Sequence, residues 1–435
     1  MKRISKHQGL LGEMWNSLAM NFDYIRSANQ AGLSGRPNSR GGPISSGFQK
    51  GRVPSADDIR RWMLTAVSSG VTTISFWVTP AEIMAQEVNG FSLLDSEGST
   101  TARLEEVGRV GRALMQHPDL FARPTKPKSE VGIVVNERNM QFCSSYAGLN
   151  QRLTYSTRGW YCMLWESGIP VDFVNVIDIG SATARQYRAL ILAFPMSLSE
   201  EVASRLEEYV RSGGNLISEA APGRVDENGI STRVEMSPKL WELFGVWQRS
   251  ITMVREPDED VRWMPAERTW GEFLDATALE GTGIMKGQKV PAHYCLQTFE
   301  PKGSEPFLDY NGAAAGVTRK AGKGTAWLLG TYIGHNGNAY RNEQTPQFVR
   351  ELMKQCGVRR QNEGELLVQK RVGEEREAWA LTNPTDHDVT EMVTVPKGAT
   401  VTDLLAGAVS VTGDQVKVAA RSLDVQVLII GRSRS

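Results

Sequence analysis

Carboxylates stand in two stretches of the sequence that we expect to be loops. Glu82 and Glu87 follow an apolar run that ends at residue 78, and Glu219, Asp226 and Glu227 lie around a Pro-Gly pair at 222–223. Two carboxyl groups brought close together can act as general acid and general base on the same bond. Acids in loops are equally typical of a solvated surface, so these residues are candidates that still need partners.

Other catalytic motifs are absent from the sequence. It contains no Gly-x-Ser-x-Gly elbow of a serine hydrolase, and its five histidines show no metal-ligand spacing. The stretch 316–324 is faintly similar to a phosphate loop, but the spacing of its glycines is wrong and Gly324 stands where Ser or Thr would hold magnesium. We predict a hairpin turn there, and we expect neither a metal nor another cofactor.

The turn after the apolar run 187–194 is a further place for a nucleophile. Glutamine-amidotransferase-like domains carry a nucleophilic cysteine at the turn after a central strand. The turn here reads Pro195-Met196-Ser197, without a thiol, and no histidine stands near Ser197 in the sequence to act as its base. An esterase or amidase is therefore the weakest alternative. His335, which follows the run 325–331, is expected in a turn.

The composition is that of an ordinary globular protein without net charge. Of the 435 residues, 40% are hydrophobic and 23% charged, with 49 Lys and Arg against 49 Asp and Glu. Nucleic acids and anionic membranes attract cationic surfaces, so neither is expected as a partner, whereas weak repulsion between copies suits self-association. The four cysteines are far apart, which predicts reduced thiols and a cytoplasmic protein, and no run approaches the roughly 18–20 apolar residues of a membrane span.

The first zone that must position these residues covers 1–125. It contains an irregular segment rich in Gly, Ser and Pro over 32–54, a helix that begins at Ser55 with a capping-box pattern, and a buried strand over 71–78. A loop and a second helix through Leu114 follow. This order is typical of the end of a βα repeat, although it holds too few strands for the eight of a closed barrel.

Two further zones complete the chain. Residues 126–360 alternate apolar runs with amphipathic helices, which predicts an α/β domain with a parallel, doubly wound sheet. Its strands are predicted at 131–135, 171–176, 187–194, 215–218 and 325–331, and its helices at 153–166, 199–210 and 345–356. Short β-type runs over 361–435 predict a small antiparallel β-domain.

These residues resemble a known family, the family 42 glycoside hydrolases, which are bacterial β-galactosidases. The features that carry the resemblance are Gly41-Gly42-Pro43, Ser46-Gly47-Phe48, the helix over 57–69, Phe76-Trp77, the stretch 89–95, the stretch 170–174, the stretch 187–195 and the stretch 209–214. The resemblance implies the end of the catalytic (β/α) barrel, a flavodoxin-like or amidotransferase-like trimerisation domain and a C-terminal β-domain. It further implies a homotrimer that acts on carbohydrate.

Two departures from the family pattern concern its catalytic carboxylates. Retaining glycosidases need two carboxyl groups about 5 Å apart. The family's acid/base Glu lies on a strand upstream of any residue here, and its nucleophile lies shortly before the Gly-Gly pair that matches 41–42. That stretch reads Gly-Arg-Pro-Asn-Ser-Arg over 35–40, with Asn38 nearest the expected position. We therefore expect that the family's chemistry does not run on a monomer of this chain.

Three functions remain open from the sequence. In the first, a glycoside hydrolase has rebuilt its site between subunits, with Glu82 and Glu87 as catalytic carboxylates and with Trp77 and Asn89 as sugar contacts. Further carboxylates that could pair between subunits are Glu219, Asp226 and Glu227. The substrate is then another glycan, for example an α-glucan, as in an amylase. Trp77 is equally typical of a core residue, and Glu87 of a solvated loop. In the second, the chain is a non-catalytic trimeric scaffold or a weak carbohydrate binder. The esterase is the third.

An incomplete barrel exposes apolar faces. We therefore expect helices or a neighbouring subunit to cover residues 55–115.

Overall fold

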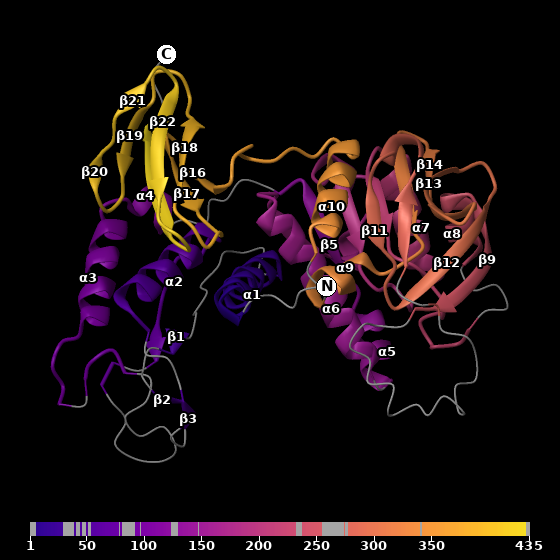
Figure 1. The fold of residues 1–435 in the computed structure, drawn as a ribbon, viewed down its shortest axis with the longest axis horizontal. Coiled ribbons are helices and arrows are strands. Elements are labelled where there is room, and N and C mark those ends of the chain that lie inside the picture. Colours follow the sequence, from indigo (N-terminus) through magenta and orange to yellow (C-terminus); the bar gives the residue numbers. More distant parts are fainter. Residues whose placement is uncertain are drawn as a thin grey trace. The chain divides into compact units, whose positions relative to one another are not determined.

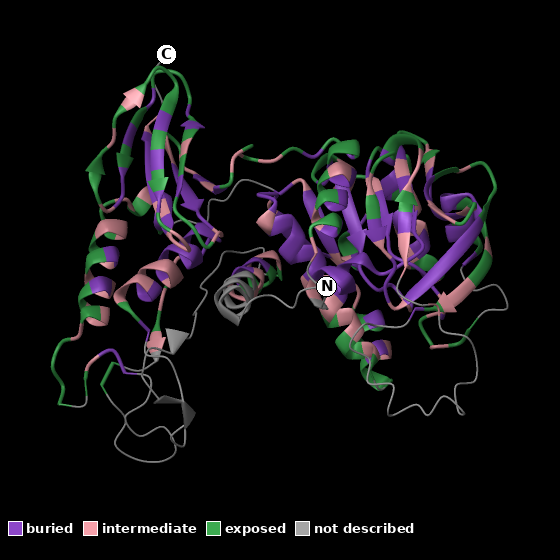
Figure 2. Cartoon of the chain, viewed as in Figure 1, coloured by how far each residue is buried: buried purple, intermediate pink, exposed green. Residues whose placement is uncertain are grey.

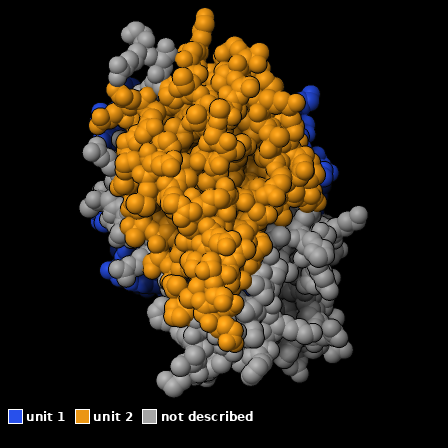
Figure 3. All heavy atoms as spheres, turned by 90° about the vertical axis from the view of Figure 1, so that its left-hand side faces the viewer, with its two compact units in different colours: residues 1–13, 128–359 blue, residues 14–127, 360–435 orange. Residues whose placement is uncertain are grey.

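The computed structural model describes most of the chain (Figure 1). The described residues are 6–28, 39–40, 44–45, 49–50, 54–77, 79–80, 92–95, 97–122, 129–146, 148–231, 237–254, 274, 277–339 and 342–431. They form two compact units, which Figure 3 colours separately: unit 1 comprises residues 1–13 and 128–359, and unit 2 comprises residues 14–127 and 360–435. No helix within the described ranges is both long and apolar enough to span a membrane.

Unit 1 is built on five parallel strands at one end of a large mixed sheet, with β6 at its edge. Their order across the sheet is β6 (Val171–Asn175), β5 (Val131–Val135), β7 (Ala189–Leu192), β8 (Asn215–Ser218) and β15 (Gly324–Leu329). The chain starts at β5, adds β6 on one side and then β7 on the other. The order therefore reverses between β5 and β7, which is where open α/β sheets place their ligands, beyond the carboxyl ends of the strands.

The same sheet continues in antiparallel strands, which the sequence interpretation did not foresee. They are β9 (Val246–Met253), β10 (Ala278–Gly281), β11 (Lys289–Pro291), β12 (Cys295–Pro301), β13 (Glu305–Tyr310) and β14 (Ala313–Ala321). The expected parallel sheet is thus mixed, because β14 joins β15 in antiparallel register. The turn between these two strands is Gly322-Lys323, with Gly322 at φ +63°, which confirms the predicted hairpin in place of a phosphate loop.

Helices pack on the sheet of unit 1, and its parallel strands are mostly buried (Figure 2). They are α5 (Glu137–Ser145), α6 (Leu149–Glu166), α7 (Glu200–Arg211), α8 (Pro238–Phe244), α9 (Ile333–Ala339) and α10 (Gln344–Gln355), with short 3-10 turns at Val176–Asp178, Thr183–Arg185 and Gly283–Met285. Leu206 and Tyr209 of α7 and Phe244 of α8 share one core cluster with alternate residues of the strands. His335 lies in α9, so its expected placement in a turn is wrong.

The N-terminal part of unit 2 is mainly helical. Its elements are α1 (Lys6–Ala28) from residue 14 onward, α2 (Ala56–Ser68), α3 (Ala102–Met115) and α4 (Pro118–Phe121), with the short strands β1 (Ser39–Arg40), β2 (Ile44–Ser45), β3 (Gln49–Lys50) and β4 (Phe76–Trp77). The capping box is confirmed, because the Ser55 side chain accepts from the Asp58 N–H while the Asp58 carboxylate accepts from the Ser55 N–H. The strand predicted over 71–78 is far shorter, and Thr73 and Ser75 are exposed.

The C-terminal part of unit 2 consists of antiparallel strands, as the sequence predicted. One sheet has the order β16 (Leu367–Val372), β17 (Arg376–Thr382), β23 (Val425–Gly431), β19 (Thr400–Asp403) and β20 (Gly407–Ala408), and the other has β18 (Val389–Thr394), β22 (Gln415–Ala420) and β21 (Val411–Thr412). Residues of β22 alternate strictly between exposed and buried, which is the period of a half-buried strand. Both sheets contribute to one core cluster.

The apolar face of α2 is covered from within its own chain. Phe22 of α1 packs against Ala66 and Val71, and strands β16, β17 and β23 lie against α2. Arg371 of β16 is buried and donates to the Val67 carbonyl at the end of α2, at 2.6 Å. Burial lowers the pKa of this guanidinium to about 10. The prediction that helices or a neighbouring subunit cover this region is confirmed for helix α1. It did not include the C-terminal strands β16, β17 and β23, which also cover α2.

A prediction for unit 1 follows from the close approach of α6 and α9. A Cβ atom added to Gly159 would lie 1.7 Å from the Gly334 carbonyl oxygen and 2.9 Å from the Asn338 nitrogen, both backbone atoms. Gly159→Ala must therefore push the two helices apart, and we expect it to lower the free energy of unfolding by about 1–3 kcal/mol or more. Chemical denaturation measures this loss.

Gly180→Ala is the matched control for this substitution. A Cβ at Gly180 meets no described heavy atom within 4 Å. We expect its free energy of unfolding to stay within about 0.5 kcal/mol of the parent protein. Equal stability of the two variants would show that the helices do not need glycine at this crossing.

Candidate functional site

The residues predicted to contact sugar fall mostly outside the described part of the chain. Glu82, Glu87 and Asn89 lie in the range 81–91, which the structure does not describe, and Trp77 is described only in its backbone. That backbone belongs to β4, whose residues pair in parallel with β1: Ser39 with Phe76 and Arg40 with Trp77. The stretch in which the family's nucleophile is expected and the strand of Trp77 are therefore direct neighbours, as two strands of a barrel are.

A second polar constellation is described completely, at the carboxyl ends of the parallel strands of unit 1. The chain leaves β7 through Phe194, whose φ of +46° is unusual for a bulky residue. Asn139 of α5 fixes this turn from both sides, because its side-chain amide donates to the Phe194 carbonyl at 2.9 Å and its oxygen accepts the Ser197 N–H at 2.9 Å. The strained turn is thus held by a buried side chain from the helix after β5.

Ser197 does not have the contacts of a nucleophile. Its hydroxyl donates to the Asp226 carbonyl at 2.8 Å, and its own carbonyl accepts the side-chain amide of Asn136 at 3.1 Å. Both bonds tie loops together and neither involves an imidazole. The described contacts therefore lend the esterase alternative no support.

Glu219 joins four elements at this end of the sheet. It follows β8 directly and is completely buried. Its carboxylate accepts the Phe194 N–H after β7 at 2.8 Å, the Gly334 N–H of α9 at 2.7 Å, and the hydroxyl of Ser156 on α6. A carboxylate is suited to this position because it accepts at both oxygens, whereas an amide would turn its NH₂ group toward one of the two backbone donors.

Burial is the main influence on the acidity of Glu219. It raises the pKa from 4.5 to about 7, although the hydrogen bonds from Ser156, Gly334 and Phe194 work in the opposite direction. Near neutral pH the group therefore exchanges between its two protonation states. Three hydrogen bonds from three segments of the chain thus meet at one buried carboxyl group.

One of two stacked histidines, His335, directly follows Gly334, whose N–H donates to Glu219. The rings of His293 and His335 have centroids 4.6 Å apart, Arg152 of α6 lies 3.3 Å from the Nε2 of His335, and its guanidinium covers the ring of Tyr294. Burial, the facing His335 and Arg152 lower the pKa of His293 to about 2, and burial and Arg152 lower that of His335 to about 3. Both imidazoles are therefore neutral at physiological pH.

The buried cysteines of this region are protonated thiols. All four cysteines are free, which agrees with the predicted reduced state. Burial raises the pKa of Cys143 and of Cys295 to about 12, so neither forms the thiolate that nucleophilic chemistry needs. The described residues at this end of the sheet therefore form a rigid polar connection between strand ends.

The carboxylates proposed for pairing between subunits behave differently from one another. Glu219 is buried inside unit 1, so its expected role in an exposed interfacial pair is wrong; as it directly follows an apolar strand, it belongs to the interior. Asp226 caps its own loop, accepting the N–H groups of Asn228 and Ile230 at 2.9 Å each. The hydrogen bond from the Ile230 N–H is the largest of the influences that lower the pKa of Asp226. Glu227 is exposed.

Comparison with known proteins shows the family to which unit 1 is related. Residues 129–359 match the family described as the β-galactosidase trimerisation domain, and they make up more than half of the chain. The chain belongs to this family. The resemblance read from the sequence is thereby confirmed: the chain corresponds to a C-terminal portion of family 42 β-galactosidases.

Two β-galactosidases align with more than four fifths of the chain. β-Galactosidase Pbg of Clostridium perfringens is 24% identical over 406 residues, covering 86% of this chain and 54% of its own, and β-galactosidase LacZ of Lactobacillus acidophilus is 23% identical over 371 residues, covering 83% and 50%. The chain thus spans about half the length of these relatives. Among solved structures, a catalytic mutant of the family 42 β-galactosidase Gan42B from G. stearothermophilus shares the fold with a TM-score of 0.76 at 19% identity, over 97% of this chain and 57% of that one.

The raised pKa of the buried Glu219 predicts how the free energy of unfolding depends on pH. The folded state holds the proton of Glu219 more tightly than the unfolded state, so between pH 4.5 and about 7 the folded state binds more protons. The contribution of Glu219 to the free energy of unfolding therefore falls as pH rises through this window, by up to about 3 kcal/mol. Glu219→Gln cannot ionise, so its free energy of unfolding lacks this contribution to the pH dependence. The difference in free energy of unfolding between Glu219→Gln and the parent protein should therefore move in favour of Glu219→Gln by up to that amount from pH 5 to pH 8.

Denaturant titrations at both pH values measure this shift. Glu227→Gln, which removes an exposed acid eight residues further on, should follow the parent protein at both. Parallel pH dependences of the parent and Glu219→Gln would show that the carboxyl group does not titrate in this window.

Proposed function

We propose that this chain is the assembling portion of a glycoside hydrolase and that it forms a homotrimer through residues 129–359. The match of this segment to the β-galactosidase trimerisation domain is the observation that carries the proposal. The absence of net charge supports it, because copies of the chain repel one another weakly. The buried thiols are compatible with a cytoplasmic protein.

The proposed architecture has three parts: a partial barrel over 1–125, a flavodoxin-like trimerisation domain over 126–360 and an antiparallel β-domain over 361–435. The strand order of unit 1, with its reversal between β5 and β7, supports the second part. The parallel pairing of β1 with β4 supports the first.

The proposed reaction is hydrolysis of an O-glycosidic bond at the edge of the partial barrel. Glu82 and Glu87 supply the carboxylates, one of them from a neighbouring subunit, while Trp77 stacks on the sugar ring and Asn89 bonds its hydroxyls. Barrel enzymes place such residues after the carboxyl ends of their strands, and all four follow or end β4. Aryl β-galactosides are the first substrates to test because the relatives are β-galactosidases, and α-glucans are the second.

A non-catalytic trimeric scaffold is the second candidate. One sequence observation favours it: residues 35–40 contain no carboxylate where the family's nucleophile is expected. In this function the chain assembles and binds carbohydrate weakly or not at all.

The proposal predicts a trimer that turns over an aryl glycoside. Sedimentation velocity of the purified chain should give the mass of three copies. Glu87→Gln should reduce turnover by about 100-fold or more, the contribution expected of a general acid or base, while Glu97→Gln, an exposed acid in a following turn, should retain it.

The other outcomes separate the two candidates. A trimer inactive on aryl galactosides, other aryl glycosides and starch is a scaffold. Turnover that Glu87→Gln retains excludes Glu87 as a catalytic carboxylate. A monomer at micromolar concentration contradicts the assembling role itself.

A further inference from the structure

Unit 2 contains a pocket that none of the functions above uses. Its volume is about 180 Å³, and its lining includes Arg60 of α2, Arg109 of α3, and Asp403, Ala419, Arg421 and Asp424 from the C-terminal strands and their connections. Ligand pockets for drug-sized molecules are larger, from about 300 Å³, so this one suits a single small ring.

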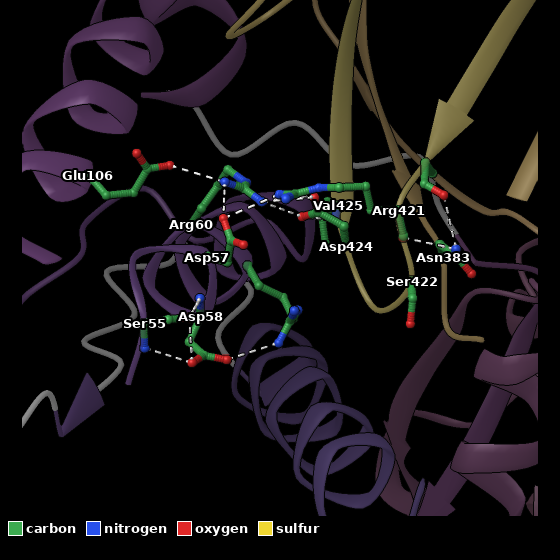
Figure 4. Close-up of polar contacts among 12 residues, drawn as sticks. Ser55, Asp57, Asp58, Arg60, Glu106, Asn383, Arg421, Ser422, Asp424 and Val425 are labelled. Carbon is green, nitrogen blue, oxygen red and sulfur yellow. Dashed lines mark hydrogen bonds and ion pairs between the residues drawn. The ribbon is translucent and has the colours of Figure 1, made fainter. Parts of the chain in front are cut away.

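The charged side chains around the pocket hold one another in place (Figure 4). Arg60 donates to both oxygens of Asp424, at 2.8 and 3.0 Å, and to Asp57 at 2.7 Å. Arg421 donates to the same two acids, at 3.1 Å to Asp424 and 3.2 Å to Asp57. Because each acid is bonded to both arginines, the polar atoms occupy fixed positions before any ligand arrives.

Two further charged residues of the pocket lining, Arg109 and Asp403, are also held by neighbouring groups. The Nε of Arg109 donates to Glu106 at 2.7 Å. Asp403 accepts the side-chain amide of Gln426 at 2.7 Å and the Leu405 N–H at 2.8 Å. The lining thus contains both guanidinium donors and carboxylate acceptors.

The balance of charge indicates the class of ligand. Three arginines, Arg60, Arg109 and Arg421, and two acids, Asp403 and Asp424, line the pocket. Asp57 and Glu106 lie outside the lining and pair with these arginines, so the arginines are already neutralised. An anion would meet acids as well as arginines, and a purely apolar molecule would strip water from charged groups at a cost. A neutral molecule whose hydroxyls both donate and accept matches a lining that contains both kinds of group.

Apolar side chains supply the rest of the surface. Leu405, Ala419, Val425 and Val427 line the pocket together with the charged groups. Their methyl and methylene groups suit the C–H face of a sugar ring, whose edge carries the hydroxyls. We propose that this pocket binds one neutral monosaccharide unit, a site beyond the proposed glycoside turnover because it shares no residue with it.

Ala419 offers a direct test on the whole chain. It is exposed, lines the pocket and lies on β22, so Ala419→Phe fills the space without removing a polar contact. Methyl β-galactopyranoside and methyl α-glucopyranoside are the probes, followed by saturation-transfer NMR and calorimetry. We expect saturable millimolar binding of at least one glycoside that Ala419→Phe weakens about 10-fold or more.

Two variants serve as controls for this test. Lys417→Phe places the same ring two residues away on the same exposed face of β22 and should bind as the parent does. Glu87→Gln, which alters the proposed catalytic edge, should also retain binding, so the two proposals fail separately. Arg421→Gln removes an exposed donor while Arg60 still pairs both acids, and it should weaken binding in a protein of unchanged stability.

Three results would overturn the assignment. The first is no saturable binding of either glycoside. The second is binding that both Ala419→Phe and Arg421→Gln leave unchanged. The third is displacement of the glycoside by inorganic phosphate at equal concentration, which would make the pocket an anion site.

Discussion

A buried carboxylate sets the geometry of the carboxyl ends of the parallel strands. Glu219 accepts hydrogen bonds from the turn after β7, from α6 and from α9, three segments that are far apart in the sequence. Each of these donors would otherwise be a buried polar group without a partner, which costs about 1–3 kcal/mol. The close approach of α6 and α9 across Gly159 and Gly334 brings the donors within reach. The strained turn at Phe194 is thereby held in place.

The chemistry of this region follows from its burial. A sheet whose order reverses between β5 and β7 offers a position that many α/β proteins use for ligands. Here the imidazoles of His293 and His335 are neutral, the thiols are protonated, and the Ser197 hydroxyl bonds a carbonyl. The groups have the types that catalysis uses, but their contacts join loops. This agrees with membership of the family described as the β-galactosidase trimerisation domain.

Unit 2 shows how a chain can close its own apolar surface. Helix α2 presents Ile59, Met63 and Ala66 toward a core, and α1 and the C-terminal strands cover them. The buried Arg371 donates to the Val67 carbonyl in the last turn of α2, where the helix dipole favours a cation, and to the Val71 carbonyl just beyond the helix. The ion pairs around Arg60 belong to the same contact between helix and strands.

Short-range features could be predicted from the sequence because they depend on neighbouring residues. The capping box at Ser55, the hairpin at 322–323, the five parallel strands and the antiparallel C-terminal runs are examples, and the ordered motifs indicated the family. Strand β9 was missed because it is mostly exposed and its partner β12 lies over forty residues away. Strand 71–78 is shorter than its apolar residues suggest. The burial of Glu219 and the cover of α2 were decided only by the tertiary structure, because both depend on contacts between segments that the sequence separates widely.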